Sequence, residues 1–195
     1  SLKQHICEGL LAGQDTTLNR GQADLDAIAI QDIEKKLSDP NRYFIHSPRK
    51  DTKTYEIRKI RGKWVVDIYG NLTVFGEDEA VTDGSFSFGT VQGQYVISLG
   101  YDNTKFKSLQ YGPNVVYDNF LIYWGDNLKD LQHCPKTVGN DFEIGGSGIE
   151  TLKYFPSSVR RNVRICDNMK LKDFSKIGKS RVGGRVRIAH NGATT

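Results

Sequence analysis

A repeat of about 22 residues in the C-terminal part of the chain is the feature that most constrains its fold. Its leucine position is occupied by Leu109, Leu131, Leu152 and Phe174, at steps of 22, 21 and 22 residues. Five further positions recur in register with it: a proline, a valine, an aromatic residue or valine, an isoleucine, and in three units an asparagine. Such register over four units indicates a repeat architecture. The residues at these five positions are Pro113, Pro135, Pro156 and Gly178; Val116, Val138, Val159 and Val182; Phe120, Phe142, Val163 and Val186; Ile122, Ile144, Ile165 and Ile188; and Asn127, Asn168 and Asn191.

Each unit predicts one short strand and one turn of a coil. The alternation of the Phe-x-Ile segment is typical of a half-buried strand, and the asparagine after it is suited to hydrogen-bonding the turn backbone. Successive strands are separated by a full turn, so they pair in parallel, and stacked units share one apolar core. With a looser register upstream, the sequence predicts a mainly β, parallel-stranded, leucine-rich-type solenoid of about six rungs over residues 71–195. Its expected ladder consists of Leu72–Val74, Tyr95–Ile97, Phe120–Ile122, Phe142–Ile144, Val163–Ile165 and Val186–Ile188.

The N-terminal third predicts a small cap on this solenoid. Apolar residues at helical spacing indicate an amphipathic helix from Ala23 to Leu37, and Lys53–Tyr69 is typical of a β-hairpin with a turn at Arg61–Gly62. We expect residues 23–70 to cover the first rung, whose strand edge would otherwise be open to pairing. Residues 1–22 are expected to form a flexible leader, because the stretch from Gly13 to Gly21 is polar.

The repeat resembles a family of phage sequences. The pattern Leu-x-x-x-Pro-x-x-Val-x-x-x-Phe-x-Ile resembles the short leucine-rich-like repeats of tailed-bacteriophage proteins, and the segment from Leu128 to Phe142 shows it well. The resemblance extends over about 120 residues, from Asn71 to Asn191, and weakens in the first two rungs and in the last. It implies a fold and a phage source, but no reaction.

The first dozen residues resemble the head-targeting peptides of T-even-type phages. In those systems a prohead protease cuts after an aliphatic-x-Glu triplet, and Ile6-Cys7-Glu8 followed by Gly9 fits this pattern. The resemblance implies cleavage between Glu8 and Gly9 and packaging in the virion. The alternative is that these residues are the frayed end of an ordinary helix.

Charge is distributed unevenly along the chain. The net charge is +4, but residues 151–195 carry eleven basic and two acidic side chains, a net +9 that leaves −5 for the rest. A basic end is suited to nucleic acid or an acidic protein, and the alternative is a solvated face that keeps the end of the solenoid soluble. The basic patch consists of Arg160, Arg161, Arg164, Lys179, Arg181, Arg185 and Arg187.

No residue pattern predicts catalysis, a metal site or a cofactor. The four histidines are far apart, and the adjacent pair His133-Cys134 has poor geometry for one metal ion. Gly145–Gly148 lacks the Lys-Ser/Thr sequel of a phosphate loop and occupies a turn of its rung. Asp141 and Glu143 are expected on the exterior of a rung without a proton-transfer partner. No apolar run reaches the roughly 18–20 residues of a membrane span.

Binding is therefore the expected function, at side chains that point outward from the strands. Exposed aromatic residues beside arginines are typical of protein interfaces, although the alternative for Trp124 is burial under a neighbouring turn. We expect a protein partner from phage or host, in the cytoplasm of an infected bacterium or in the virion interior. Nucleic-acid association through the basic rungs and a structural role in the phage head are the alternatives. The expected contact residues are Leu121, Tyr123, Trp124, Glu143, Arg164 and Arg187.

Deletion of residues 1–8 tests the leader hypothesis. A leader outside the repeat register is expected to change the free energy of unfolding by less than about 1 kcal/mol, measured by denaturant titration. Two docked side chains, Leu2 and Ile6, would instead contribute roughly 3–6 kcal/mol. Protein recovered from mature virions is expected to begin at Gly9, and an intact N-terminus there would contradict the packaging hypothesis.

Overall fold

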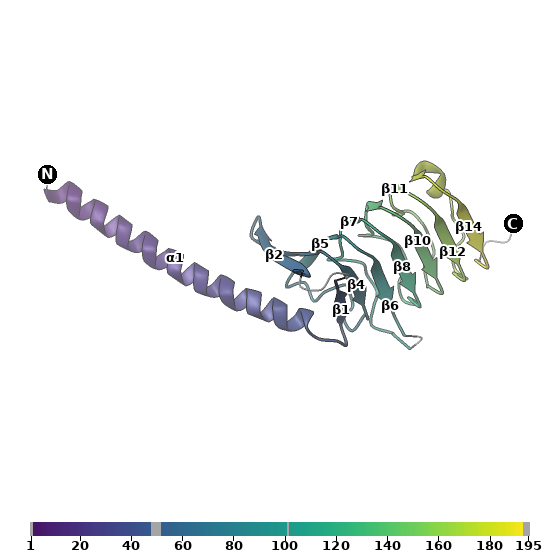
Figure 1. The fold of residues 1–195 in the computed structure, drawn as a ribbon, viewed down its shortest axis with the longest axis horizontal. Coiled ribbons are helices and arrows are strands. Elements are labelled where there is room, and N and C mark those ends of the chain that lie inside the picture. Colours follow the sequence, from purple (N-terminus) through teal and green to yellow (C-terminus); the bar gives the residue numbers. More distant parts are fainter. Residues whose placement is uncertain (1, 48–51, 101, 193–195) are drawn as a thin grey trace. The chain divides into compact units, whose positions relative to one another are not determined.

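The computed structural model describes residues 2–47, 52–100 and 102–192, and the side chains of these residues from residue 20 onward. The chain divides into two compact units, Ser1–Lys36 and Leu37–Thr195. The first unit consists of the helix α1 (Leu2–Leu37), which extends to the first residue of the second. The second is a parallel β-solenoid, whose strands are stacked along its length in Figure 1.

The solenoid has two sheets of seven strands, and in each sheet six strands are parallel and the strand at the N-terminal end is antiparallel. Sheet A consists of β1 (Tyr43–His46), β4 (Asn71–Val74), β6 (Tyr95–Ser98), β8 (Phe120–Tyr123), β10 (Phe142–Gly145), β12 (Val163–Cys166) and β14 (Val186–Ala189). Sheet B consists of β2 (Tyr55–Ile60), β3 (Lys63–Ile68), β5 (Ser87–Val91), β7 (Val115–Val116), β9 (Thr137–Val138), β11 (Ser158–Val159) and β13 (Arg181–Val182). A rung is one sheet B strand and the sheet A strand that follows it, from rung 1 (β3 and β4) to rung 6 (β13 and β14). A short 3₁₀ helix, η1 (Ile177–Lys179), precedes β13.

The predicted parallel ladder is confirmed. All six predicted triplets pair in sheet A in the predicted register, so Phe142 lies between Phe120 and Val163, and Ile144 lies next to Ile122. The inward residues of the inner rungs are fully buried, as are the repeat leucines Leu131 and Leu152 on the turns. Stacking therefore produces the continuous core that a single rung cannot form.

Sheet B was not predicted as a sheet, although its residues were part of the repeat. The repeat valines are the inward residues of its two-residue strands, and Val116, Val138 and Val159 lie in register with one another. A strand of two residues is too short to show an alternating pattern in the sequence. The solenoid also begins earlier than predicted. Because β3 pairs in parallel with β5, rung 1 begins at Lys63 rather than at Asn71.

Antiparallel strands cover the N-terminal end of both sheets. The predicted hairpin is confirmed as β2 and β3, with the turn at Arg61 and Gly62 in left-handed backbone conformations. The strand β2 covers the edge of sheet B, and β1, which the sequence analysis missed, covers the edge of sheet A. At the other end, Val186 and Ile188 in rung 6 are 43% and 44% exposed, since no described strand follows them.

The helix α1 is longer than predicted. It begins at Leu2 rather than at Ala23, so the residues expected to form a flexible leader belong to the same helix. The glycines within it cost about 1 kcal/mol each relative to alanine, but no proline occurs before Pro40 to interrupt it. Leu25 and Ile28 are exposed, so the predicted apolar face is not buried along its whole length. The proposed cleavage point at Glu8 and Gly9 lies in α1, where the structure does not describe side chains.

Repeat asparagines hydrogen-bond the turn backbone, as predicted, and they also connect successive rungs, which was not predicted. Asn168 is fully buried, and its Oδ1 accepts hydrogen bonds from the backbone N–H and the hydroxyl of Ser147 in the preceding rung. Its Nδ2 donates to the Cys166 carbonyl at 2.8 Å, and its own N–H donates to Oδ1 of Asn191 in the next rung at 3.0 Å. These side chains satisfy turn groups that neither sheet can pair.

Replacement of a central core residue tests this packing. Ile144→Ala is expected to lower the free energy of unfolding by about 2–5 kcal/mol, because rungs on both sides of the cavity hold its walls apart. The matched control is Ile188→Ala at the same position of rung 6, where partial exposure limits the expected loss to about 1 kcal/mol. Equal losses for the two variants in urea titrations would contradict the rigid central core.

Candidate functional site

The outward residues of sheet A form straight rows, because the strands pair in register without a slip. The central row contains one residue from each strand and crosses the whole sheet. In order from the N-terminal end, these residues are Phe44, Thr73, Val96, Leu121, Glu143, Arg164 and Arg187.

The character of this row changes from apolar to basic along the solenoid. Its N-terminal part includes Phe44, which is 57% exposed, and the half-buried Val96 and Leu121. Its C-terminal part begins at Glu143, whose carboxylate lies 3.5 Å from the guanidinium of Arg164. The structure places Leu121, Glu143 and the two arginines outward in one row, as predicted. Phe44 was missed because β1 was not expected, although Tyr43–His46 alternates in burial as a strand does.

Tyr123 lies in the neighbouring outward row, beside a residue that has no side chain. Its neighbour in β10 is Gly145, and a Cβ atom there would lie 3.4 Å from Cys166 Sγ and 3.9 Å from a ring atom of Tyr123. Desolvation, and then the nearby Glu143 carboxylate, raise the pKa of the Tyr123 hydroxyl. The hydroxyl therefore stays protonated at neutral pH and is able to donate a hydrogen bond.

Trp124 occupies the corner that follows β8, in a left-handed backbone conformation with φ of 65°. The left-handed conformation recurs directly after β10, β12 and β14, where the residues are Gly146, Asp167 and His190. A Cβ atom at residue 146 would lie 2.8 Å from Cε3 of Trp124, so the indole ring lies against the bare backbone of rung 4. Trp124 remains 40% exposed, so it is only partly covered by the neighbouring rung.

A groove runs from Trp124 across the corners of rungs 4 and 5, and we call it the Trp124 groove. Its volume is about 510 Å³, and the backbone of Gly146 and Gly148 is part of its lining. Met169, 70% exposed, stands on the far side, and charged residues of both signs surround it. The lining residues are Trp124, Asp126, Asn127, Lys129, Gly146, Ser147, Gly148, Asp167, Met169 and Lys170. Neither Met169 nor the glycines were predicted as site residues, because an open corner leaves no periodic signal.

The seven residues of the predicted basic patch all belong to the last two rungs. Arg160, Arg161 and Arg164 come from rung 5, and the other four come from rung 6 or the turn before it. Arg164 and Arg187 are direct neighbours in sheet A, at the basic end of the central row.

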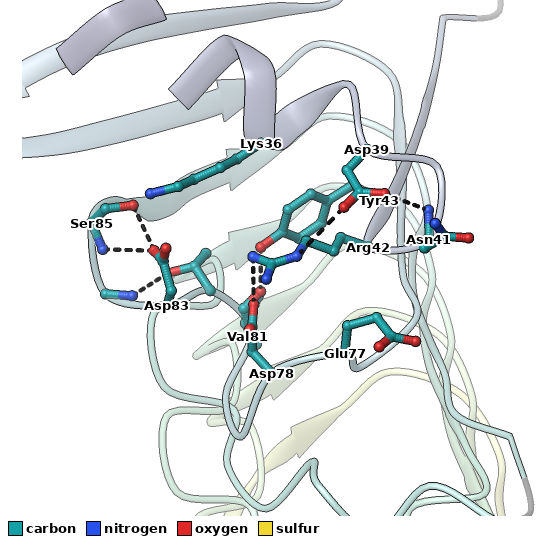
Figure 2. A network of polar contacts seen from close by, with 12 residues as sticks. Lys36, Asp39, Asn41, Arg42, Tyr43, Glu77, Asp78, Val81, Asp83 and Ser85 are labelled. Carbon is teal, nitrogen blue, oxygen red and sulfur yellow. Dashed lines mark hydrogen bonds and ion pairs between the residues drawn. The ribbon is translucent and has the colours of Figure 1, made fainter. Parts of the chain in front are cut away.

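A polar network, shown in Figure 2, lies where β1 begins and has a structural role. Arg42 lies between two carboxylates, with its Nη1 3.0 Å from Asp78 and its Nε 3.6 Å from Asp39. The Tyr43 hydroxyl donates to the Val81 carbonyl at 2.9 Å, and burial, followed by the Asp78 charge, raises its pKa. These contacts hold β1 against the loop between β4 and β5.

The reactive side chains of the described region do not form a catalytic arrangement. Burial raises the pKa of both described thiols, Cys134 and Cys166, so both are protonated at neutral pH and are poor nucleophiles. Gly145 was predicted in the turn but is the last residue of β10, and the corner that follows it contains Ser147, which is hydrogen-bonded to Asn168. Among the described residues there is no group of three side chains able to hold a metal ion, and no helix long and apolar enough to cross a membrane.

Comparison of the chain with known protein families, with curated proteins and with solved structures found no match. The resemblance to repeat proteins of tailed bacteriophages rests on the repeat residues alone and stays a prediction.

Paired substitutions test the left-handed conformation of Trp124. Trp124→Gly is expected to be about 1 kcal/mol more stable than Trp124→Ala, because only glycine adopts this conformation without steric cost. At the neighbouring strand residue the order is expected to reverse, with Tyr123→Ala more stable than Tyr123→Gly. Urea unfolding of the four variants measures both differences, and an alanine variant at 124 as stable as the glycine variant would exclude the strain.

Proposed function

We propose that the chain is a non-enzymatic repeat protein that binds a protein partner with the Trp124 groove and the adjoining outward face of sheet A. The observation that carries this proposal is Trp124 itself, a large aromatic side chain that is partly exposed in a left-handed corner. A non-glycine residue in this conformation costs roughly 1–2 kcal/mol. Since the same left-handed position holds Gly146, Asp167 and His190 in rungs 4, 5 and 6, the fold alone does not require a tryptophan there.

The composition around Trp124 supports a protein partner. Tryptophan, tyrosine, methionine and arginine are enriched at protein interfaces, and tryptophan and tyrosine are frequent hot spots. Trp124 and Met169 line the groove, and Tyr123 and Leu121 lie in the strand directly before it. The charged residues around the groove are suited to the polar rim of such an interface.

The shape of the surface favours a protein over a small molecule. Small-molecule sites are concave and bury most of the ligand surface. Here Trp124 of the groove directly follows β8, and the central row of sheet A continues from Leu121 in that strand through Val96 to Phe44. A partner segment that fills the groove is therefore able to extend over several rungs. If the phage resemblance holds, the partner is a phage or host protein, met in the infected cell or in the virion interior.

A capture experiment with matched variants tests the proposal. The tagged full chain is incubated with lysates of infected and uninfected bacteria, and captured proteins are quantified by mass spectrometry. Leu121→Glu and Trp124→Gly are expected to reduce capture of the partner at least about tenfold, as loss of a hot-spot contact does. The control Thr137→Glu adds the same charge to the exposed face of sheet B and is expected to leave capture unchanged.

Three outcomes would contradict the proposal. Equal capture of the partner by the wild type and by Leu121→Glu places the contact elsewhere. Loss of capture with Thr137→Glu as well as with Leu121→Glu indicates a nonspecific effect of the added charge. Capture of further copies of the chain alone, with concentration-dependent sedimentation, favours a structural component that assembles with itself. Thermal melts of all variants show whether the fold is retained.

A further inference from the structure

The arginines of rungs 5 and 6 gather at one corner of the solenoid, where the chain passes from sheet B to sheet A. Arg160 and Arg161 form this corner in rung 5, between β11 and β12, and Arg185 forms it in rung 6 after the pair Gly183–Gly184. The remaining three extend the charge onto both sheets. The whole cluster, which we call the arginine corner, consists of Arg160, Arg161, Arg164, Arg181, Arg185 and Arg187.

Hydrogen bonds between the rungs hold the backbone of this corner in place. Gly184 N–H donates to the Arg161 carbonyl at 2.8 Å, and Gly183 N–H donates to the Val159 carbonyl at 3.0 Å. Arg185 N–H donates to Oδ1 of Asn162 at 3.0 Å. A Cβ atom at residue 183 would lie 2.1 Å from the Arg160 carbonyl oxygen, so glycine allows the two rungs to approach closely here. The six arginines are therefore concentrated on rungs about 4.8 Å apart.

The arginine corner has little compensating charge. Arg42 and Arg58, in the N-terminal part of the solenoid, each contact a carboxylate, Asp78 and Asp67 respectively. Within the described residues, Arg164 is the one member of the corner with a carboxylate partner, Glu143 at 3.5 Å. The sequence from Phe174 to Gly192 contains no acidic residue. Like charges so close together repel, and an external anion relieves that repulsion.

Protection of an open sheet edge does not explain the whole cluster. Arginines on β13 and β14 are suited to prevent pairing with another chain, since charged side chains discourage edge-to-edge contact. Arg160, Arg161 and Arg164 lie in rung 5, however, and both of its strands are already paired on each side. A charged cluster that extends beyond the edge strands indicates a bound polyanion.

We propose that the arginine corner binds the phosphodiester backbone of double-stranded nucleic acid without sequence preference. The guanidinium group donates two parallel hydrogen bonds to phosphate and keeps its charge, so the six arginines of the corner are suited to phosphate. The elements that carry them are two-residue strands, four-residue strands and corners, with no helix that would enter a groove to read base edges. Contact with phosphates alone gives affinity that depends on salt and not on sequence.

Fluorescence anisotropy with the full chain tests this proposal. Two labelled 20-base-pair duplexes of unrelated sequence are titrated between about 50 and 200 mM salt. Their dissociation constants are expected to agree within about twofold. Since each phosphate contact contributes about −0.9 to the slope of log K against log salt, six contacts give a slope of about −5.

Charge-matched variants locate the site. The triple variant Arg160→Gln, Arg161→Gln, Arg185→Gln is expected to weaken binding at least about tenfold at 100 mM salt and to reduce the slope by about 3. The control Lys105→Gln, Lys107→Gln, Lys136→Gln removes the same charge from exposed lysines of the turns and is expected to change affinity less than twofold. Leu121→Glu is expected to bind the duplexes as the wild type does, which separates this surface from the protein-binding one.

Other outcomes would overturn the proposal. Absence of duplex binding at 50 mM salt, or equal weakening in the two triple variants, excludes the arginine corner as a nucleic-acid site. Polyglutamate of matched charge that competes as well as the duplex identifies an acidic protein as the partner instead. Thermal melts show whether the triple variants retain the fold, as expected for substitutions at exposed arginines.

Discussion

The in-register stacking of one rung on the next is the interaction on which the rest of this structure depends. Hydrogen bonds between parallel strands fix the spacing, and identical repeat positions then lie directly over one another, as Phe142 does over Phe120. The core follows from this register, because the inward residues of two sheets and the turn leucines enclose one continuous apolar column. The turns follow as well: Asn168 and Asn162 reach the backbone of an adjacent rung because its groups recur one strand spacing away. A slip of one residue would turn every outward side chain into the core.

The same register organises the surface. Each outward position becomes a row along the solenoid, so a change in residue type along the repeat becomes a change in surface chemistry along the molecule. In sheet A the row passes from Phe44 and Leu121 to Arg164 and Arg187, with Glu143 at the transition. The scaffold therefore presents an apolar surface and a basic one on the same sheet without any change in fold. The two proposed binding surfaces use these two ends.

The sequence was most informative where the period is regular. The six strand triplets, the buried repeat valines and the β2–β3 hairpin followed from spacing and alternation. Sheet B itself was missed because its two-residue strands carry no periodic signal, and β1 was missed because it lies outside the repeat. The length of α1 was missed because Gly13 and the polar residues after it weaken a helix without ending it. In the candidate site, the outward row was predictable, but the groove was not: it depends on Trp124 in a left-handed corner above a glycine, which only the backbone geometry reveals.

Residues that depart from the repeat have different effects on the molecule, depending on whether their side chains are buried or exposed. Tyr95 stands where the next two rungs have phenylalanine, and it stacks on Phe120 at a ring distance of 4.8 Å. Its hydroxyl is the one buried side-chain group of the described residues without a hydrogen-bond partner, and such a group costs about 1–3 kcal/mol. Because Tyr95 is 1% exposed, this departure cannot contact a partner that binds the surface. Trp124 also departs from the residue that the backbone favours, but its ring is exposed beside an open groove. A destabilising residue at the surface gains a benefit from contact with another molecule, whereas one in the core has only its packing to offset the loss. This difference favours the corner of rung 3 as the proposed binding site.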